Sequence, residues 1–354
     1  MRKITTQDLE AIAIGSTVLG TGGGGDPYIG KLMAQNAIEQ FGEVPLLDPE
    51  EVPDDTLIVP VAAFGAPVIL LEKLFNGKEA LAAFEMMEKY LGEKIFATMP
   101  AEAGGLNGVI PFAVAAEKNI PIIDADGMGR AYPRLEMVTF TLYDIPASPI
   151  TQADEKGNRS IYHTINNVWG ETMVGSTVIP MGGSCFIACY PMSGKQMKEA
   201  AVRNVISKAQ KLGLAIGEAK QKGISPLNNL LSAGDGKLIF KGKIIDVNVQ
   251  TDGRWNKGIC RLEGLEGYAG QQMQLDFQNE FLIATSGEKV IASVPDLITV
   301  LDLETAEPLT IESLQYGYRL NVIAMPCDEK WKSKAGIALG GPSAFGYDSP
   351  YVPI

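Results

Sequence analysis

The sequence predicts an N-terminal α/β domain with a mostly parallel sheet, followed by a β-rich domain of barrel or sandwich type that carries inserted helices. A chain of 354 residues can form about two hydrophobic cores. Short apolar runs alternate with helical patterns over the first 160 residues, whereas closely spaced β-prone runs dominate after Lys237. We therefore expect an α/β domain at 1–165, a β-rich domain at 166–335, and a tail at 336–354 that docks back on the body.

The N-terminal elements follow from hydrophobic periodicity and glycine placement. A helix is expected from about Thr6, because Leu9, Ile12 and Leu19 recur at helical spacing. It must end at the glycine loop Gly20–Pro27, since consecutive glycines are costly in a helix. Further helices are expected at Tyr28–Gln40, Gly77–Leu91 and Gly108–Lys118, and buried strands at Leu57–Val61, Lys94–Thr98 and Pro121–Asp124.

The second half of the sequence is less regular. Val174–Tyr190 is apolar and β-prone, and a long helix is expected over Gln196–Leu212, with Gly213 as its stop. The expected strands of the C-terminal domain are Lys237–Phe240, Lys243–Gln250, Gly258–Glu263, Gln272–Phe277, Phe281–Thr285, Lys289–Val294, Leu297–Leu301 and Leu320–Ala324. Many short strands in succession are typical of an antiparallel barrel or sandwich.

Composition narrows the classes of function. The formal net charge is −12 and no Lys/Arg cluster interrupts it, which argues against nucleic-acid and anionic-membrane binding as main roles. The apolar stretch Thr56–Leu71 is too short to span a bilayer, and the acidic residues Asp8 and Glu10 argue against a signal peptide. We expect a cytoplasmic protein with reduced cysteines. The oligomeric state is left open, a homo-oligomer included.

The glycine loop is the first candidate site. It holds a formal G-x-G-x-x-G match from Gly20 to Gly25, but a helix precedes it where the dinucleotide motif needs a strand, so NAD is not expected. The backbone N–H groups of the four glycines could still bind a substrate carboxylate or ring oxygen. These candidate binding residues are Gly22, Gly23, Gly24 and Gly25. The alternative is a tight connection between two helices.

The second candidate follows the strand that ends near residue 124. Asp124 and Asp126 stand at its carboxyl end, where ligands bind in open α/β sheets, and could activate water or hold a divalent metal. Arg130 could bind a carboxylate or oxyanion, or keep a neighbouring Asp ionised. The alternative is an Asx-type turn with a surface ion pair. The strand context favours the functional reading, with Asp124 and Asp126 as catalytic candidates.

A third candidate is the loop after the preceding predicted strand. If the two strands are neighbours, Glu102 and Asn107 would lie beside the Asp124 loop, Glu102 as a catalytic group and Asn107 as a substrate-binding one. Glu136 is a further candidate close by. The alternative is an ordinary loop with a helix cap.

The cysteines are weaker candidates for a functional site. Cys185 and Cys189 have C-x₃-C spacing on a predicted strand, and His163 is the only imidazole in the chain. Cysteines on apolar strands are most often core residues, and we prefer that interpretation to a nucleophilic Cys185 paired with His163. Spacing alone does not indicate a zinc site.

Three segments of the sequence together resemble one family. Gly20–Pro27, Asp124–Pro133 and the closing Ala344–Asp348 occur in this order in the S-methyl thiohydantoin desulfurase family, whose members are often encoded beside hydantoinase/oxoprolinase-type enzymes. The resemblance covers essentially the whole chain. One departure is Ser343, where many members are expected to carry an arginine.

The resemblance implies hydrolysis of an S-methylated thiohydantoin to a hydantoin and methanethiol. Such a reaction needs an activated water and stabilisation of the adduct. Asp124 and Asp126 would then activate water, and the glycine loop with Arg130 would hold the ring or a side-chain carboxylate. The alternative, from another class, is a non-catalytic subunit that binds a hydantoinase-like partner.

Overall fold

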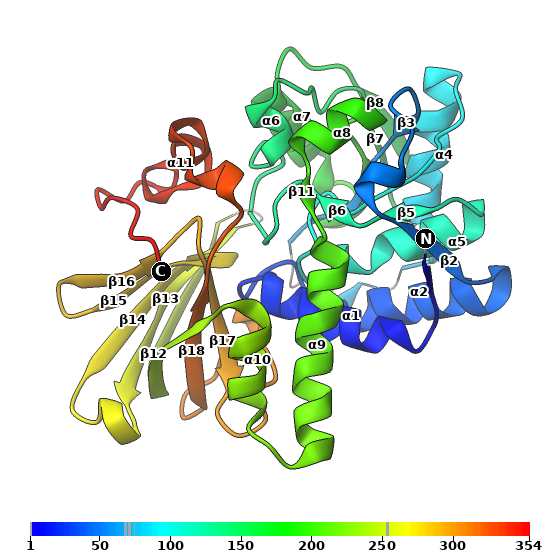
Figure 1. The fold of residues 1–354 in the computed structure, drawn as a ribbon. Helices are drawn as coiled ribbons and strands as arrows, with labels where there is room; N and C mark the ends of the chain where they lie inside the picture. Colours follow the sequence, from blue (N-terminus) through cyan, green and yellow to red (C-terminus); the bar gives the residue numbers. More distant parts are fainter. Residues whose placement is uncertain (1, 67–68, 70–71, 74, 253–254) are drawn as a thin grey trace.

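The computed structural model describes residues 2–66, 69, 72–73, 75–252 and 255–354, and it shows two domains. In Figure 1 small sheets and their helices form one part, and a single large sheet forms the other. The helices are α1 (Asp8–Leu19), α2 (Pro27–Phe41), α4 (Glu79–Leu91), α5 (Ile110–Lys118), α6 (Thr139–Leu142), α7 (Asn167–Val178), α8 (Gly194–Ala200), α9 (Val205–Lys222), α10 (Pro226–Gly234) and α11 (Lys334–Gly340).

The N-terminal domain contains several small sheets. Their strands are β1 (Arg2–Ile4), β2 (Val44–Leu47), β3 (Leu57–Ile58), β4 (Val61–Gly65), β5 (Ile122–Ile123), β6 (Ala125–Asp126), β7 (Ile150–Ala153), β8 (Arg159–Tyr162), β9 (Ser184–Ala188), β10 (Met192–Ser193) and β11 (Val202–Arg203). They pair in the orders β1-β2-β5 and β4-β9-β7-β8, with two-stranded pairs β10-β3 and β11-β6.

The expected mostly parallel sheet is not confirmed, because these sheets are mixed. β2 and β5 are parallel, and isolated parallel bridges join Thr98 to Ile122 and Ile58 to Ala97. Beyond this parallel centre, β4 pairs antiparallel with β9, and β9 pairs antiparallel with β7. The antiparallel partners come from distant parts of the sequence, which alternation of strands and helices does not reveal.

The β-rich C-terminal domain is confirmed as one curled antiparallel sheet of seven strands (Figure 1). Its strands are β12 (Lys237–Asp252), β13 (Trp255–Gly264), β14 (Gln272–Gln278), β15 (Glu280–Ser286), β16 (Lys289–Ser293), β17 (Leu297–Asp302) and β18 (Arg319–Met325), in the order β16-β15-β14-β13-β12-β18-β17. The two strands expected between Lys237 and Gln250 form one long strand, whose register shifts twice at bulges.

Two other expectations are corrected. The predicted helix Gln196–Leu212 is split into α8 and α9, because the intervening β11 pairs with β6 and Asn204 takes a left-handed conformation, with φ of 59°. The first part of the β-prone stretch Val174–Tyr190 belongs to α7, whose N-terminus is capped by the Asn166 side chain through the Trp169 N–H.

The two domains are joined by close helix packing. A Cβ atom on Gly15 of α1 would lie 1.7 Å from the Ala209 carbonyl oxygen of α9, and one on Gly213 of α9 would lie 1.9 Å from the Ala11 carbonyl oxygen. These reciprocal glycines let the helix backbones touch. The C-terminal end of α1 in turn contacts β17, where the Thr299 hydroxyl donates to the Val18 carbonyl at 2.8 Å. The glycine loop that follows α1 is thereby held against the large sheet.

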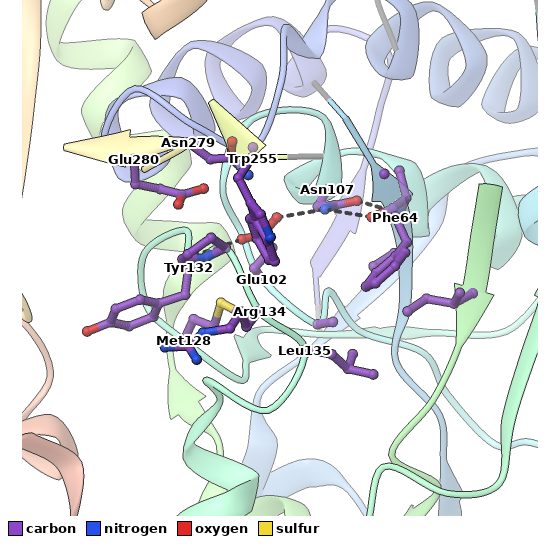
Figure 2. Close-up of a pocket in the computed structure, with 17 residues that line it drawn as sticks. Phe64, Glu102, Asn107, Met128, Tyr132, Arg134, Leu135, Trp255, Asn279 and Glu280 are labelled. Carbon is purple, nitrogen blue, oxygen red and sulfur yellow. Dashed lines mark hydrogen bonds between the residues drawn. The ribbon is translucent and has the colours of Figure 1, made fainter. Parts of the chain in front are cut away.

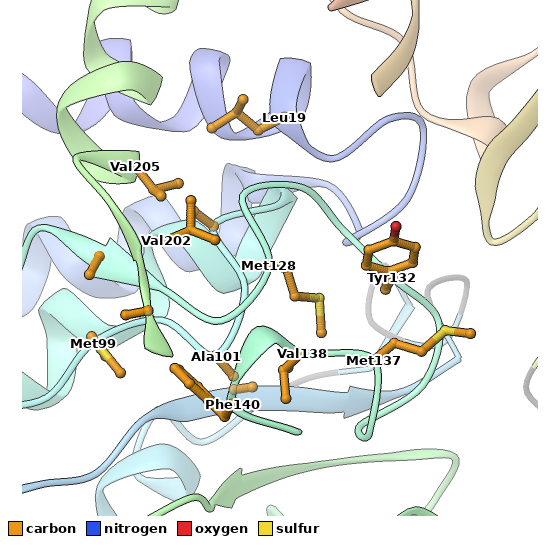
Figure 3. Close-up of a cluster of buried hydrophobic side chains, with 14 of the residues drawn as sticks. Leu19, Met99, Ala101, Met128, Tyr132, Met137, Val138, Phe140, Val202 and Val205 are labelled. Atoms are coloured by element: carbon orange, nitrogen blue, oxygen red, sulfur yellow. The ribbon is translucent and has the colours of Figure 1, made fainter. Parts of the chain in front are cut away.

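The segment after β6 is anchored by apolar side chains. Met128, Tyr132, Val138 and Phe140 belong to the largest buried cluster of the molecule (Figure 3). Their burial fixes the intervening polar residues in position.

None of the helices among the described residues is long and apolar enough to cross a membrane. Within the apolar stretch Thr56–Leu71, positions 67, 68, 70 and 71 lie outside the described residues.

Candidate functional site

A pocket lies where the two domains meet. It holds about 670 Å³ of empty space, the open solvent at its mouth included. Its walls come from β4, from the loop 101–107, from the segment 128–135, and from Trp255, Asn279 and Glu280 of the C-terminal sheet. Figure 2 shows Glu102, Glu280, Tyr132 and Trp255 gathered at one end of the pocket, with Phe64 and Leu135 toward the other.

Glu102 is the predicted catalytic residue that lines this pocket. One carboxylate oxygen accepts a hydrogen bond from Asn107 Nδ2 at 2.7 Å, and the other a long one from the Tyr132 N–H at 3.4 Å. Asn107 is itself fixed by Ala63 of β4, whose N–H donates to Asn107 Oδ1 at 2.6 Å. Burial, reinforced by the charge of Asp126, raises the pKa of Glu102 to about 7. Glu102 can therefore hold or release a proton near neutral pH.

Glu280 is a second buried carboxyl group in the pocket, and sequence reasoning did not identify it. It is the first residue of β15, and its Oε2 has no hydrogen-bond partner among the described residues. Burial, and then the negative charge of Glu102, raises the pKa of Glu280 well above its ordinary value. Two neighbouring buried carboxyl groups resist double ionisation, so this pair retains a proton at neutral pH.

The predicted glycine loop adjoins the pocket, with Gly24 in its lining. Gly23 leaves room for the second carboxyl group, because a Cβ there would lie 2.3 Å from Glu280 Oε1. The carbonyl of Gly22 accepts from the Ile311 N–H at 2.9 Å. Gly24 and Gly25 both have positive φ, at 75° and 74°. The backbone of the loop thus packs against the backbone of its neighbours. Besides the lining at Gly24, the loop contributes to the pocket by leaving space at Gly23 for the Glu280 carboxyl group.

Asp126 is fully buried beneath the pocket loops. Its Oδ1 accepts from the N–H groups of Met128 and Gly129, and its Oδ2 accepts from the Ala103 N–H at 2.7 Å. Burial raises its pKa to about 7 despite these three donors. Asp126 thereby ties the Glu102 loop to the Arg130 segment.

Asp124 lies away from the pocket, at the start of α9. Its carboxylate accepts from the Ser207 N–H at 3.0 Å and from the Ser207 hydroxyl. The structure therefore does not bring Asp124 and Glu102 together in one cavity, although both belong to the predicted set.

Arg130 is completely buried and joins the two domains. Its guanidinium donates to the carbonyls of Asp296 at 2.8 Å and Pro295 at 3.1 Å, and to the Thr21 hydroxyl at 3.1 Å. It also lies over the Tyr132 ring, 4.6 Å from its centroid. Arg130 does not line the pocket, but its positive charge opposes the rise in the pKa of both Glu102 and Glu280.

Among the described residues, Arg134 is the cation that lines the pocket directly. Its Nη2 donates to the Ala344 carbonyl at 2.9 Å, and its Nε lies 3.6 Å from Glu136 Oε1. The Phe345 ring lies against the guanidinium and is also stacked on Tyr132. The C-terminal segment therefore supports this wall of the pocket. Ser343, where the resemblance led us to expect an arginine, is exposed and outside the lining.

The cysteines and the single histidine occupy other places. Cys185 is buried, accepts from Gln152 Nε2 at 3.0 Å, and has its pKa raised to about 12 by burial. Cys189 is buried in the same cluster, as expected of a core residue. His163 instead contacts the Tyr90 hydroxyl at 2.6 Å. Among the described residues, no three His, Cys, Asp or Glu side chains are grouped as metal ligands.

The residues that sequence reasoning missed are Glu280, Asn279, Trp255, Tyr132 and Arg134. A local signal existed for two of them, since Tyr132 lies within the Asp124–Pro133 motif and Arg134 directly follows it. The sequence also indicated a turn at 278–280 between two predicted strands. It did not indicate that this turn lies beside the glycine loop, because the hydrogen bond from the Phe281 N–H to the Thr21 carbonyl joins residues 260 positions apart.

Comparisons with known proteins cover the whole chain. Family models described as the S-Me-THD-like N-terminal domain and the S-Me-THD-like C-terminal domain match residues 7–164 and 165–354. A solved structure of a protein from Chromobacterium violaceum superimposes with a TM-score of 0.82, at 24% identity and full coverage of both chains, and so shares the fold. No curated protein matches.

Proposed function

Because the chain belongs to the S-Me-THD-like family, that is, the S-methyl thiohydantoin desulfurase family expected from its motifs, we propose that it is a hydrolase of a small hydantoin-like ring. The proposed reaction adds water to the ring carbon that bears an S-methyl group. The carbon–sulfur bond breaks, methanethiol leaves, and a carbonyl remains on the ring. One water is consumed, and no oxidant or reductant is needed.

The single observation that carries this proposal is the pair of buried carboxyl groups, Glu102 and Glu280, in the pocket between the domains. The pKa of Glu102 is raised to about 7, and that of Glu280 is raised well above its ordinary value. Two neighbouring carboxyl groups lose their protons one after the other, so one can act as base and the other as acid on the same substrate. This pair is therefore the proposed catalytic centre.

In the proposed mechanism, ionised Glu102 accepts a proton from the attacking water. Asn107 orients this carboxylate through its Nδ2 donor and is held in turn by Ala63. Protonated Glu280 donates its proton to the adjacent ring nitrogen, and the proton that the adduct's hydroxyl loses as the carbonyl forms goes to the leaving methanethiolate. Within the described part of the chain Glu280 Oε2 has no hydrogen-bond partner, and it is thus available to the substrate. Exchange with solvent then returns the proton from Glu102 to Glu280.

The remaining walls suit a small, flat, weakly polar ring. Trp255, Phe64 and Leu135 supply apolar surface, while Asn279 adds a polar group beside Glu280. The Asn279 side chain is oriented by the Asn256 N–H, which donates to its Oδ1 at 2.8 Å. Such a mixture of apolar walls and a few fixed polar groups is typical of small-molecule sites.

The experiment is to measure methanethiol release from S-methylated thiohydantoins with varied ring substituents. Wild-type protein is compared with Glu280→Gln, and each is assayed as metal-replete and as chelated protein. Release by the wild type that is lost in Glu280→Gln is the expected result. Loss of wild-type release on chelation would instead make a divalent metal part of the reaction. Absence of release across all substituents would overturn the desulfurase proposal.

A further inference from the structure

A third carboxyl group, Glu312, lies close to the pocket, and the proposed mechanism does not use it. Glu312 belongs to the short 3₁₀ helix η4 (Ile311–Ser313) and is not part of the pocket lining. The side chain is half-buried, but its Oε1 is fully buried and has no hydrogen-bond partner among the described residues. A buried carboxyl oxygen without a partner is uncommon in proteins and is often found where charge has a function.

The glycine loop holds Glu312 and Glu280 near each other. The Ile311 N–H donates to the Gly22 carbonyl at 2.9 Å. A Cβ atom on Gly22 would lie 2.6 Å from the Phe281 ring and 3.1 Å from the Ile311 side chain, so both residues pack on this glycine. Glu280 precedes Phe281 in the sequence, and Glu312 follows Ile311. The two carboxyl groups are therefore carried by neighbours of residues that meet at Gly22.

Two asparagines form a second connection between these carboxyl groups. Asn279, which precedes Glu280 and lines the pocket, donates its backbone N–H to the Asn256 carbonyl at 2.8 Å. In return the Asn256 N–H donates to Asn279 Oδ1 at 2.8 Å. The Asn256 side chain lies close enough to Glu312 to favour its ionised form. The pocket wall at Asn279 is thus tied to the surroundings of Glu312.

The hydrogen-bond donors around the two groups decide which of them carries the negative charge. Burial raises the pKa of Glu312, but its own backbone N–H and the side chains of Thr310 and Asn256 oppose this rise. Burial raises the pKa of Glu280 well above its ordinary value, and the charges of Glu102 and Glu312 add to this effect. Where neighbouring carboxyl groups compete, the charge resides on the group with more donors. Glu312 is therefore the ionised group and Glu280 the protonated one.

Other charges act on this pair in both directions. Arg130 lowers the pKa of Glu280, whereas Glu102 raises it. Asp26, the exposed N-cap residue of α2, raises the pKa of Glu312. Glu102 accepts a proton in each turnover of the proposed reaction, so its effect on Glu280 is then lost. Glu312 lies outside the pocket lining and keeps its charge throughout the cycle.

We propose that Glu312 is a positioning residue of the acid–base pair: its carboxylate keeps Glu280 in the protonated form that can donate to the substrate. Glu312 acts through Glu280, next to the glycine loop, and does not touch the substrate. The catalytic meaning of this role rests on the proposed function, but the protonation of Glu280 can be measured without any substrate.

The test is an infrared titration of the full-length protein, in which the carbonyl stretch of protonated Glu280 is the band that Glu280→Gln lacks. In the wild type this band should be present at neutral pH. The pH at which it is half lost should fall by about one unit in Glu312→Gln, because a neighbouring negative charge is removed. Glu312→Asp retains the charge and should keep the wild-type midpoint. Glu288→Gln, on an exposed turn, is the matched control and should also keep it.

The same variants are then compared in the methanethiol assay. The acid must be protonated, so kcat/KM falls as pH rises through the pKa of Glu280, and this falling limb should move to lower pH in Glu312→Gln. If Glu312→Gln does not fold, Glu312→Met, which is uncharged and of similar size, replaces it and must give the same shift.

Two infrared results would overturn the proposal, whatever the assay shows. One is a Glu280 band with the same midpoint in the wild type and in Glu312→Gln. The other is a band that is absent from the wild type at neutral pH, or that persists in both proteins up to alkaline unfolding. A shifted midpoint without methanethiol release would instead remove the proposed reaction and support the effect of Glu312 on Glu280.

Discussion

Two pairs of buried carboxyl groups in this molecule differ in their hydrogen-bond partners. Asp124 and Asp126 follow a strand, and their oxygens are occupied by N–H and hydroxyl donors from neighbouring loops and α9. Glu102 and Glu280 lie in the pocket, and one Glu280 oxygen accepts no hydrogen bond from the residues that the structure describes. A carboxylate whose oxygens all accept hydrogen bonds from the protein holds the backbone in place. A carboxyl group that faces a cavity with an oxygen left over is available for chemistry.

This difference follows from loop geometry. The Asp126 side chain is short and lies within a turn, where it accepts from the successive N–H groups of Met128 and Gly129 and from the Ala103 N–H of a neighbouring loop. The glutamates are longer and start from segments on opposite sides of the domain junction, so their carboxyl groups extend into the space between. The predictions below test this division of roles, beginning with the largest expected effect.

The first prediction concerns the unpartnered carboxyl group. Glu280→Gln removes the proposed proton donor while preserving shape, so kcat/KM for methanethiol release should fall roughly 10²–10⁴-fold. Thermal stability should stay within a few degrees of wild type, because a buried carboxyl group is replaced by a neutral amide. Glu288→Gln, at the exposed far turn of β15, is the matched control and should have wild-type activity. Full activity in Glu280→Gln would remove Glu280 from the mechanism.

The second prediction concerns the buried arginine between the domains. Arg130→Met leaves the carbonyls of Pro295 and Asp296 without their donor, at a cost of about 3 kcal/mol or more in the free energy of unfolding. Urea denaturation measures this loss. Arg134→Met, on the partly exposed arginine of the pocket wall, should cost clearly less. An equal or larger loss in Arg134→Met would contradict the role of Arg130 as the link between domains.

The third prediction is a dependence of activity on pH. The proposed base must be ionised, and the pKa of Glu102 is about 7, so kcat/KM should rise as pH increases through neutrality. The ionised fraction grows about fiftyfold between pH 5 and pH 7, and the rate should follow it. The rising limb should disappear in Glu102→Gln. A wild-type profile that is flat over this range would exclude Glu102 as the base.

The fourth and smallest effect concerns the glycine loop. Gly23→Ala introduces a methyl group where Glu280 Oε1 now lies, so the carboxyl group must move, and activity should fall about tenfold. Gly217→Ala in α9 is the control, because nothing lies within 4 Å of its Cβ position. That control should be neutral or stabilise the fold by up to about 1 kcal/mol. Equal activity in the two variants would show that the loop leaves Glu280 unconstrained.

Local patterns predicted much of the fold. The helices near residues 8–19, 27–41 and 79–91 and the strands of the C-terminal sheet follow from periodicity and turns. The mixed pairing of β4 with β9 could not be predicted in this way, because it joins segments more than a hundred residues apart. The break between α8 and α9 is likewise caused by a tertiary contact, the pairing of β11 with β6.

The candidate site was predicted only in part, for the same reason. Glu102, Asn107 and Gly24 do line the pocket, since each lies on a loop whose position follows from a neighbouring strand or helix. Glu280 was missed because its turn has no unusual sequence feature. Only the packing of this turn against the distant glycine loop places Glu280 in the pocket. Asp124 and Arg130 were predicted as site residues but lie outside the pocket. Each forms hydrogen bonds with backbone groups of residues distant in sequence, and these contacts could not be predicted from the sequence.

The most direct measurement compares Glu102→Gln with Asp124→Asn in the same methanethiol-release assay, with rates normalised to folded protein. If the pocket pair carries the chemistry, Glu102→Gln should lose at least about 10²-fold in kcat/KM, and Asp124→Asn should stay within about threefold of wild type. The opposite ranking, with Asp124→Asn inactive and Glu102→Gln active, would contradict the assignment of the pocket carboxyl groups as the catalytic centre.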